Sequence, residues 1–358
     1  MADTTSHHHD EARRNTRARF EQWAQNPACQ ANTVSAVHNV KMADVARAEG
    51  YEPTIGQSPF AIARGDQFER SLLNNEAERL VEALSERGLL AEGASGFKDF
   101  RIRINGGPLA TLDAAIDETK DFLRRVATGS ERTVALVAGA TFRIPRGIML
   151  PEAVLILDAL AIRTDRTPVE LIVGEIKTYP DRGGHTDSRE LAVARAQAGL
   201  YLHAIQLVVQ ELGIGDSVIV RNDGFLVLTR PGSNWPSVRA FEDLRYQAER
   251  ARRGFELLEA AAAGLPPFDR LSNDPIEAVR EVETQLSEAC LTFCDRVAKC
   301  YADALEAGDP VALGDDVPRF LGSIELSRAL QLLNGDQPRN PAEEDLMLRI
   351  RQAEGAYS

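Results

Sequence analysis

The spacing of apolar residues predicts helices over much of the chain. Between about residues 64 and 87, Phe68, Leu72, Leu80 and Leu84 recur at multiples of three and four, a pattern typical of an amphipathic helix. The remaining predicted helices span residues 112–126, 188–212, 237–263, 275–307, 317–333 and 342–354. Both ends of the chain are therefore expected to be mainly helical.

The middle of the chain has a different pattern, which predicts strands. The segments rich in Val, Ile and Leu are residues 133–138, 153–163 and 169–177. A tight turn is expected at residues 164–168, Thr-Asp-Arg-Thr-Pro. Two shorter segments, 218–221 and 225–229, flank Asn222-Asp223-Gly224, and this turn sequence predicts a hairpin. The order of elements predicts an α/β fold, a small sheet surrounded by helices.

Composition and charge exclude several classes of protein. The longest nearly uninterrupted apolar stretch, residues 153–162 with Asp158 in its middle, is half the ~20 residues that a transmembrane helix needs. The first residues lack the apolar core of a signal peptide, so we expect an intracellular, cytoplasmic protein with no membrane partner. The net charge of −13 argues against a generic nucleic-acid coat protein. Lysine is rare against 36 arginines, so a lysine beside candidate catalytic residues is less easily explained by chance.

The predicted second and third strands carry residues that could bind a metal ion. Strict alternation along residues 153–163 would place Asp158 on one face among branched aliphatic residues. In the next strand Glu175 and Lys177 share a face, again after an apolar run. Two carboxylates can bind a hard divalent cation, and a lysine can orient a water or stabilise phosphate charge. The alternative is a buried carboxylate–lysine ion pair with a purely structural role.

This Asp…Glu-x-Lys arrangement resembles the PD-(D/E)XK nuclease superfamily, with its restriction-endonuclease-like core sheet. The following predicted helix carries Gln197-Ala-Gly-Leu-Tyr201, and a Q-x-x-x-Y helix after E-x-K resembles the RecB-like branch. The resemblance implies that Asp158, Glu175 and the Ile176 carbonyl bind Mg²⁺ or Mn²⁺, while Gln197 and Tyr201 contact DNA. A tyrosine that simply packs in the core is the alternative.

An upstream segment shows where the sequence departs from that branch. The branch usually has a histidine four residues after a glycine, as a further metal ligand. This chain has Gly65-Asp-Gln-Phe-Glu69, which places Glu69 at that position. A glutamate can bind Mg²⁺ or Mn²⁺ through oxygen, so Glu69 is a candidate ligand. It could equally be a surface helix residue.

Four cysteines suggest a second metal centre. Cys29 precedes the motifs above, and Cys290, Cys294 and Cys300 follow them. Cysteines clustered in this way indicate metal or cluster ligands, with zinc or simply buried small residues as alternatives. The one-plus-three order resembles the iron–sulfur subset of RecB-like nucleases, the CRISPR-associated and AddB-type exonucleases. The resemblance implies a 4Fe–4S cluster, although the first C-terminal gap is one residue longer than usual.

Together these features predict a metal-dependent DNA nuclease acting in DNA repair or anti-phage defence, an exonuclease on single-stranded ends. The expected organisation is a polar tail (residues 1–18), a nuclease domain (19–300) and an acidic helical extension (301–358). DNA is the expected partner, with a helicase or other repair or defence subunits. The first alternative is a nuclease-like, iron–sulfur, DNA-binding subunit with little activity of its own. The second is a structural protein stapled by zinc.

Overall fold

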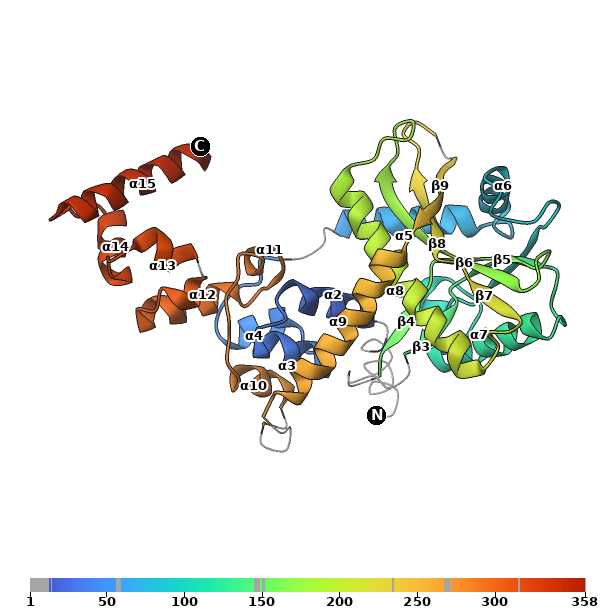
Figure 1. Ribbon diagram of the computed structural model, residues 1–358, viewed down its shortest axis with the longest axis horizontal. Coiled ribbons are helices and arrows are strands. Elements are labelled where there is room, and N and C mark those ends of the chain that lie inside the picture. The colour runs from blue at the N-terminus through green and yellow to red at the C-terminus, as the bar shows by residue number, and fades with distance from the viewer. Residues whose placement is uncertain are drawn as a thin grey trace. The chain divides into compact units, whose positions relative to one another are not determined.

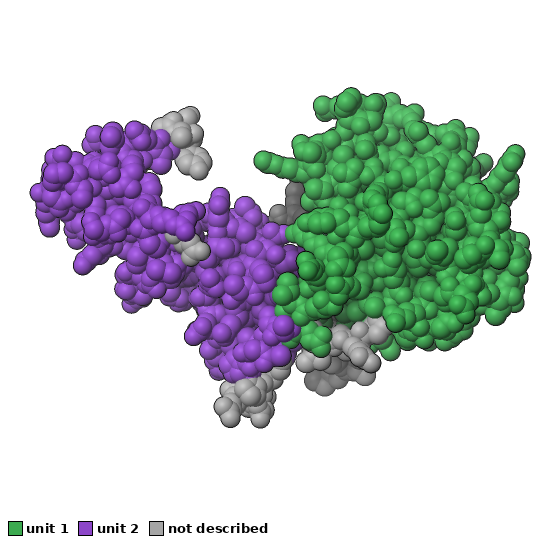
Figure 2. Space-filling view, viewed as in Figure 1, with its two compact units in different colours: residues 1–17, 57–259 green, residues 18–56, 260–358 purple. Residues whose placement is uncertain are grey.

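The chain forms two compact units (Figure 2). A computed structural model describes residues 13, 15–55, 59–144, 149, 152–233, 235–266, 271–272, 274–314 and 316–357. The first unit comprises residues 1–17 and 57–259, and the second comprises 18–56 and 260–358. Each unit therefore combines an N-terminal segment with a later one.

These units divide the chain differently from the organisation expected above. The boundary expected at residue 300 lies inside the second unit. Most of the expected polar tail, residues 1–12 and 14, falls outside the described residues. The last residues of the expected tail, 16–18, instead belong to α2 (Thr16–Gln25), whose first residue, Thr16, is fully buried.

A mixed seven-stranded sheet forms the centre of the first unit (Figure 1). The strand order is β1-β2-β5-β6-β8-β9, with β7 also paired to β6. The strands are β1 (Gly96–Asp99), β2 (Val134–Ala138), β5 (Ala159–Arg163), β6 (Val169–Pro180), β7 (Val218–Val220), β8 (Asp223–Thr229) and β9 (Pro236–Asp243). Strands β5 and β6 are antiparallel, whereas β6 and β8 are parallel and are connected through a long helix. A separate pair consists of β3 (Thr141–Arg143) and β4 (Val154–Ile156).

Helices flank this sheet, which confirms the predicted α/β class. They are α5 (Pro59–Leu73), α6 (Glu78–Glu86), α7 (Leu112–Ala127), α8 (Ser188–Leu212) and α9 (Arg245–Ala263), with a short 3₁₀ turn η1 (Arg103–Asn105). Helix α8 packs against β6, β7 and β8, α5 packs against β6, and α6 packs against β9. The predicted helix at residues 188–212 has the same bounds as α8, which begins where Asp187 caps two backbone N–H groups.

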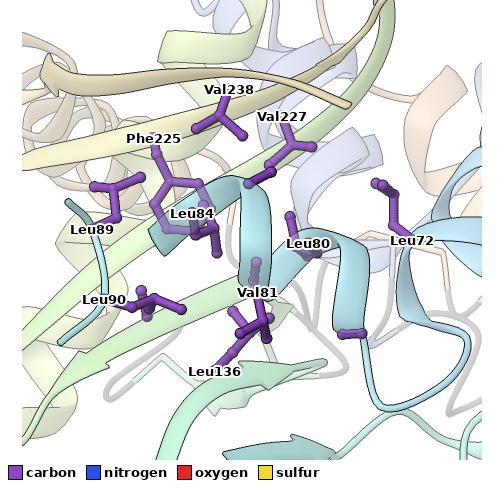
Figure 3. Close-up of a cluster of buried hydrophobic side chains, with 14 of the residues drawn as sticks. Leu72, Leu80, Val81, Leu84, Leu89, Leu90, Leu136, Phe225, Val227 and Val238 are labelled. Carbon is purple, nitrogen blue, oxygen red and sulfur yellow. The ribbon is translucent and has the colours of Figure 1, made fainter. Parts of the chain in front are cut away.

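One face of the sheet is covered by leucines from α5, α6 and the segment that follows them (Figure 3). Leu80 and Leu84 of α6 belong to the same buried cluster as Phe225 and Val227 of β8. Leu80 and Leu84 recur at a spacing of four, so one helix face supplies both side chains. Each large apolar side chain that is fully buried contributes about 1.5–3 kcal/mol, so this layer stabilises the sheet substantially.

Gly174 is required by the packing of this layer. It pairs with Phe225 across β6 and β8, and a Cβ at Gly174 would lie 2.1 Å from Cζ of the Phe225 ring. Because residues alternate along β6, Ile172, Gly174 and Ile176 face this cluster, while Glu175 projects from the opposite face.

The second unit is helical in its described residues. Its helices are α2 (Thr16–Gln25), whose first two residues belong to the first unit, α3 (Gln30–His38), α4 (Met42–Ala48), α10 (Pro275–Arg280), α11 (Cys290–Phe293), α12 (Val297–Ala307), α13 (Asp316–Leu321), α14 (Leu326–Leu333) and α15 (Pro341–Tyr357), with 3₁₀ turn η3 (Val311–Leu313). Helix α10 packs against α3 and α4, and a core that includes Val34, Val45 and Val279 joins them. A second small core joins α13, α14 and α15 through residues such as Leu321, Leu332 and Leu346.

Two predicted elements around residue 225 are wrong. Strands β7 and β8 do not form a hairpin, because both pair in parallel with successive stretches of β6. The chain therefore keeps the same direction beside β6 as it passes Asn222. A tight turn at this point would have reversed it. The predicted helix at residues 237–263 begins instead as strand β9, antiparallel to β8, and α9 starts only at Arg245.

Three predicted helices are interrupted in the structure. The segment 64–87 is divided into α5 and α6 by Asn75, Glu76 and Ala77, which all adopt left-handed backbone conformations. The segment 275–307 contains three short helices, and 317–333 contains two. No helix among the described residues combines the length and the apolar character needed to cross a membrane.

Candidate functional site

The β5–β6 hairpin brings Asp158, Glu175 and Lys177 together. Ala159 of β5 pairs with Gly174 of β6, so Asp158 and Glu175 are the next residues along the two strands. An oxygen of Asp158, Oδ2, accepts a hydrogen bond of 2.9 Å from the backbone N–H of Ile176. The Lys177 ammonium forms an ion pair with Oε1 of Glu175. The convergence expected from the sequence is therefore present in the geometry.

Asp158 is positioned by a bend in the chain and not by the continuous strand that the sequence predicts. The expected continuous strand at residues 153–163 is broken into β4 and β5, and Asp158 lies in the bend between them. Leu157 holds the bend by exchanging backbone hydrogen bonds of 2.8 and 3.0 Å with Ala140 and Gly139. The predicted alternation across Asp158 is therefore wrong, and the bend determines where its carboxylate points.

Glu175 is a fully buried carboxylate whose neighbours are charged. Burial, and after it the charge of Asp158, raises the pKa of Glu175 to about 7, while Lys177 and Arg17 act in the opposite direction. Apart from these two cations, its oxygens have no hydrogen-bond partner among the described residues. Burial opposes the charged form of Lys177, but the charges of Glu175 and Asp158 outweigh it and raise the lysine pKa. The site therefore holds a carboxylate that is poised to gain or lose charge near neutral pH.

Glu69 on α5 lies within electrostatic range of Asp158. Burial and then Asp158 raise the pKa of Glu69 to about 7, while Arg101 lowers it. Arg101 lies 3.5 Å from Glu69 through Nη1 and also binds Asp99. The structure thus places Glu69 beside the carboxylate site with a counter-cation of its own. In the described part of the chain, no group of three or more His, Cys, Asp or Glu residues is arranged to hold a metal ion.

Gln197 and Tyr201 lie on the inward face of α8. Tyr201 is 2% exposed and Gln197 is 6% exposed, so both side chains face the protein interior. Burial, and next the charge of Glu175, raises the pKa of Tyr201 well above its usual value. The Oε1 atom of Gln197 is buried and has no hydrogen-bond partner among the described residues. Gly199, between them, lets α8 approach α9, because a Cβ there would lie 2.3 Å from Cβ of Gln247.

Two further residues belong to this site and were not identified from the sequence. Arg17, in the first turn of α2, donates from Nη1 to the Tyr201 hydroxyl at 3.2 Å and lies 3.8 Å from Glu175 Oε1. Burial raises the pKa of Tyr179. The charge of Lys177 lowers this pKa and the charge of Glu175 raises it, so Tyr179 lies within electrostatic range of both residues. Alternation along β6 could have identified Tyr179, two residues after Lys177. No local sequence pattern identifies Arg17, which lies in the segment expected to be a polar tail.

The four cysteines come together in the second unit. Cys29 precedes α3, Cys290 begins α11, Cys294 follows α11, and Cys300 lies in α12. All four contribute to one core cluster, and none forms a disulfide. Burial raises the pKa of Cys294 to about 12 and that of Cys300 to about 11, and Cys29 and Cys290 add to both shifts. The thiols of Cys294 and Cys300 would therefore stay neutral unless a cation displaced their protons.

The surroundings of the cysteines contain donors that could compensate thiolate charge. Asn26 donates through Nδ2 to Sγ of Cys290 at 3.3 Å, and the backbone N–H of Arg296 donates to Cys294. The Arg296 guanidinium is buried, and its Nη1 has no hydrogen-bond partner among the described residues. Four thiols are a donor set that iron–sulfur clusters and zinc ions use, but as the structure describes them these cysteines are not arranged as a group of three or more that could hold a metal ion.

Comparison with protein-family models, with curated proteins and with solved structures finds no match to this chain.

Proposed function

We propose that the protein is a metal-dependent DNA nuclease with a RecB-like PD-(D/E)XK site. The observation that carries the proposal is the buried Glu175, in contact with Lys177 and next to Asp158 at the end of a hairpin. A fully buried carboxylate is costly unless its charge is used or compensated. A structural ion pair needs one carboxylate for one lysine, whereas here Asp158 acts on both Glu175 and Glu69. Arg17 and Arg101 supply two further cations, so the site is a network of several charges.

The residues have distinct parts in the proposed hydrolysis. Asp158, Glu175 and the Ile176 carbonyl would hold Mg²⁺ or Mn²⁺, with Glu69 as a further ligand. When bound, such a cation polarises a phosphate and lowers the pKa of a water. Lys177 orients the attacking water in line with the scissile phosphodiester bond. Its pairing with Glu175 keeps the ammonium fixed at the reacting centre.

Burial changes the part that we assign to Gln197 and Tyr201. Because both side chains face inward, they support the site from behind, and Tyr201 holds the Arg17 guanidinium through its hydroxyl. The Arg17 side chain is 36% exposed, so its guanidinium can reach a DNA phosphate. The proposed DNA contact therefore moves from α8 to Arg17.

The cysteine cluster would hold a 4Fe–4S cluster through Cys29, Cys290, Cys294 and Cys300. Phosphodiester hydrolysis transfers no electrons, so the role proposed for the cluster is structural. It would join the N-terminal segment of the second unit to its C-terminal helices, because Cys29 and the other three cysteines are far apart in sequence. Zinc bound by the same four thiolates is the alternative, and elemental analysis for iron distinguishes the two.

A second candidate function is a DNA-binding, iron–sulfur subunit of a larger repair or defence machine, with little activity alone. The inward orientation of Gln197 and Tyr201 and the net charge of −13 favour it. In either case we propose DNA as the partner, together with a helicase or other subunits, in the cytoplasm.

DNA cleavage tests the proposal directly. Protein purified without oxygen is incubated with end-labelled single-stranded and double-stranded DNA and Mn²⁺, with EDTA as the control. We expect shortening of the single strand from an end, and no shortening with EDTA. A protein that binds DNA in Mn²⁺ but never cleaves it would support the second candidate instead.

A further inference from the structure

A groove of about 680 Å³ in the second unit is lined by none of the four cysteines. It is formed by the segment 283–288, by α12, and by η3 with the residues on either side of it. Two apolar side chains that line it are exposed, Leu291 at 55% and Val311 at 61%. Exposed apolar groups that gather along a groove are typical of a surface at which another chain docks.

The groove is acidic. Its lining residues include no lysine or arginine and four carboxylates, those of Glu283, Glu288, Asp309 and Asp316. Asp316 forms an ion pair of 3.1 Å with Arg319, in which both side chains are largely exposed. The second unit as a whole has 22 acidic residues against 12 basic ones, so it carries −10 of the net charge of −13. Such a surface repels a nucleic-acid backbone and attracts a basic chain.

The backbone along this groove has hydrogen-bonding groups to offer. Residues 283–287 belong to no helix, strand or turn. The carbonyl of Glu283 accepts from the backbone N–H of Ala31 at 3.2 Å. The carbonyl of Gln285 accepts from Nδ2 of Asn26 at 2.7 Å. Acceptors two residues apart that bond to one neighbouring segment are typical of an extended chain. None of the backbone N–H groups of this segment donates to another described residue, so it resembles a strand edge that lacks a partner.

We propose that this groove binds an extended, basic segment of a partner protein, which pairs with the backbone of residues 283–287. Main-chain hydrogen bonds give affinity in this kind of recognition, and alternate side chains give specificity. Lysine or arginine side chains of the segment reach the carboxylates of the groove, and its apolar side chains cover Leu291 and Val311. Neither DNA cleavage nor metal binding enters this inference, so it can fail or succeed separately from the proposed function.

Binding of short synthetic peptides to the full-length protein tests the inference. Lysine or arginine alternates in each peptide with valine, leucine or phenylalanine, and a matched peptide has glutamate at every basic position. Fluorescence anisotropy of the labelled peptides should show binding of basic peptides that weakens as salt increases, and no binding of their glutamate counterparts. Each binding peptide is also made in two forms, N-methylated at every second residue along one edge or the other. One form should bind roughly 10-fold more weakly and the other should not change, because only one edge of an extended peptide faces the protein.

Substitutions in the protein locate the binding site. Glu283→Lys/Glu288→Lys reverses two exposed charges of the groove and should weaken peptide binding roughly 10-fold or more. Val311→Ser should weaken it less, because it removes one apolar contact. Glu306→Lys is the matched control, an exposed carboxylate of α12 that does not line the groove. All these side chains are exposed, so the melting temperatures should stay close to that of the wild type.

Four outcomes would overturn the inference. The first is a wild-type protein that binds no basic peptide more tightly than its glutamate counterpart. The second is an equal loss of affinity in Glu283→Lys/Glu288→Lys and in Glu306→Lys. The third is self-association that the double variant abolishes, which would identify a second copy of the chain as the occupant. The fourth is binding of single-stranded DNA that the double variant abolishes, which would identify a nucleic acid.

Discussion

The carboxylate site of the first unit and the cysteine cluster of the second both bury groups that must become charged to bind a cation. The two regions differ in the pKa values of those groups. The pKa of Glu175 is about 7, so near neutral pH it changes charge readily. The pKa values of Cys294 and Cys300 are about 12 and 11, so only a strongly bound metal would keep them ionised.

This difference indicates a division of labour. A carboxylate site balanced near neutral pH, with Lys177 in contact, suits a divalent cation that exchanges during turnover. A set of buried thiols suits a metal centre that is assembled once and then remains bound to the protein. If this division holds, a substitution in one region should leave the chemistry of the other intact.

The largest expected effect is on catalysis. Lys177→Ala should lower Mn²⁺-dependent cleavage by roughly 10²–10⁴-fold, because the water loses the group that orients it. The fold should survive, since Glu175 can take up a proton when its partner is gone. Steady-state cleavage of labelled DNA measures the effect. The control is Lys120→Ala, which removes a lysine paired with Glu211 on another part of the unit. Equal rates for the two variants would exclude the proposed mechanism.

The second effect concerns the cysteine cluster. Cys29→Ser should release bound iron, lower the melting temperature and make the chain sensitive to protease. A link from Cys29 to Cys290 closes a loop of about 260 residues, and the chain-entropy model gives ~5–6 kcal/mol as an upper bound for such a closure. Iron analysis and thermal melting measure the change. If iron content and melting stay the same, Cys29 is not a ligand.

The third effect tests the packing that supports the carboxylate site. Gly174→Ala should destabilise the protein by about 1–3 kcal/mol, because the added methyl group meets the Phe225 ring. Its neighbour Glu175 should then be displaced and the cleavage rate should fall. Gly215→Ala is the matched control, since a Cβ there meets nothing within 4 Å. Denaturant unfolding of both variants measures the difference. Equal stabilities would show that the Phe225 ring does not pack against Gly174.

The fourth effect is a dependence on pH. In the metal-free protein Glu69 and Glu175 have pKa values of about 7, above the usual 4.5 of an unfolded glutamate. The folded state therefore holds protons that the unfolded state has lost, and stability should fall as the pH rises from about 4.5 to 7. Thermal melting across this range should show the slope, and Glu175→Gln should flatten it. Cation affinity should change in the opposite direction and increase with pH. A stability that rises over the same range in metal-free protein would contradict the assignment.

The smallest effect comes from Tyr201→Phe. This change removes the hydroxyl that accepts from Arg17 and leaves the buried ring in place. A hydrogen bond of about 0.5–1.5 kcal/mol corresponds to a loss of roughly 2–10-fold in cleavage. Tyr246→Phe, at a tyrosine that is 73% exposed, is the control. If Tyr201→Phe cleaves DNA at the wild-type rate, Tyr201 serves only to fill the core.

The sequence predicted best where local chemistry alone determines the structure. The bounds of α8 follow from its apolar pattern and from the cap at Asp187, and the β5–β6 turn follows from its turn residues. The hairpin at Asn222 was wrong because tertiary pairing with β6 overrides a turn signal that is strong in isolation. β9 was assigned to a helix for a similar reason, since it is defined by its pairing with β8.

The candidate site shows the same limit. Glu175 and Lys177 were identifiable because two residues on one strand necessarily share a face. Asp158 was found through an alternation that the strand break removes, so its position depends on Leu157 and the backbone of Ala140. Arg17 could not be found, because it lies more than 150 residues before Glu175 in the sequence and only the folded chain brings them together.

The division of labour is tested most directly by measuring iron content and Mn²⁺-dependent DNA cleavage on the same anaerobic preparations. Wild-type protein, Lys177→Ala and Cys29→Ser are compared. We predict that the wild type contains about four irons per chain and cleaves end-labelled single-stranded DNA. Lys177→Ala should retain the iron without cleaving, and Cys29→Ser should lose the iron together with its stability. A wild-type protein that holds its iron and cleaves neither single-stranded nor double-stranded DNA would contradict the account.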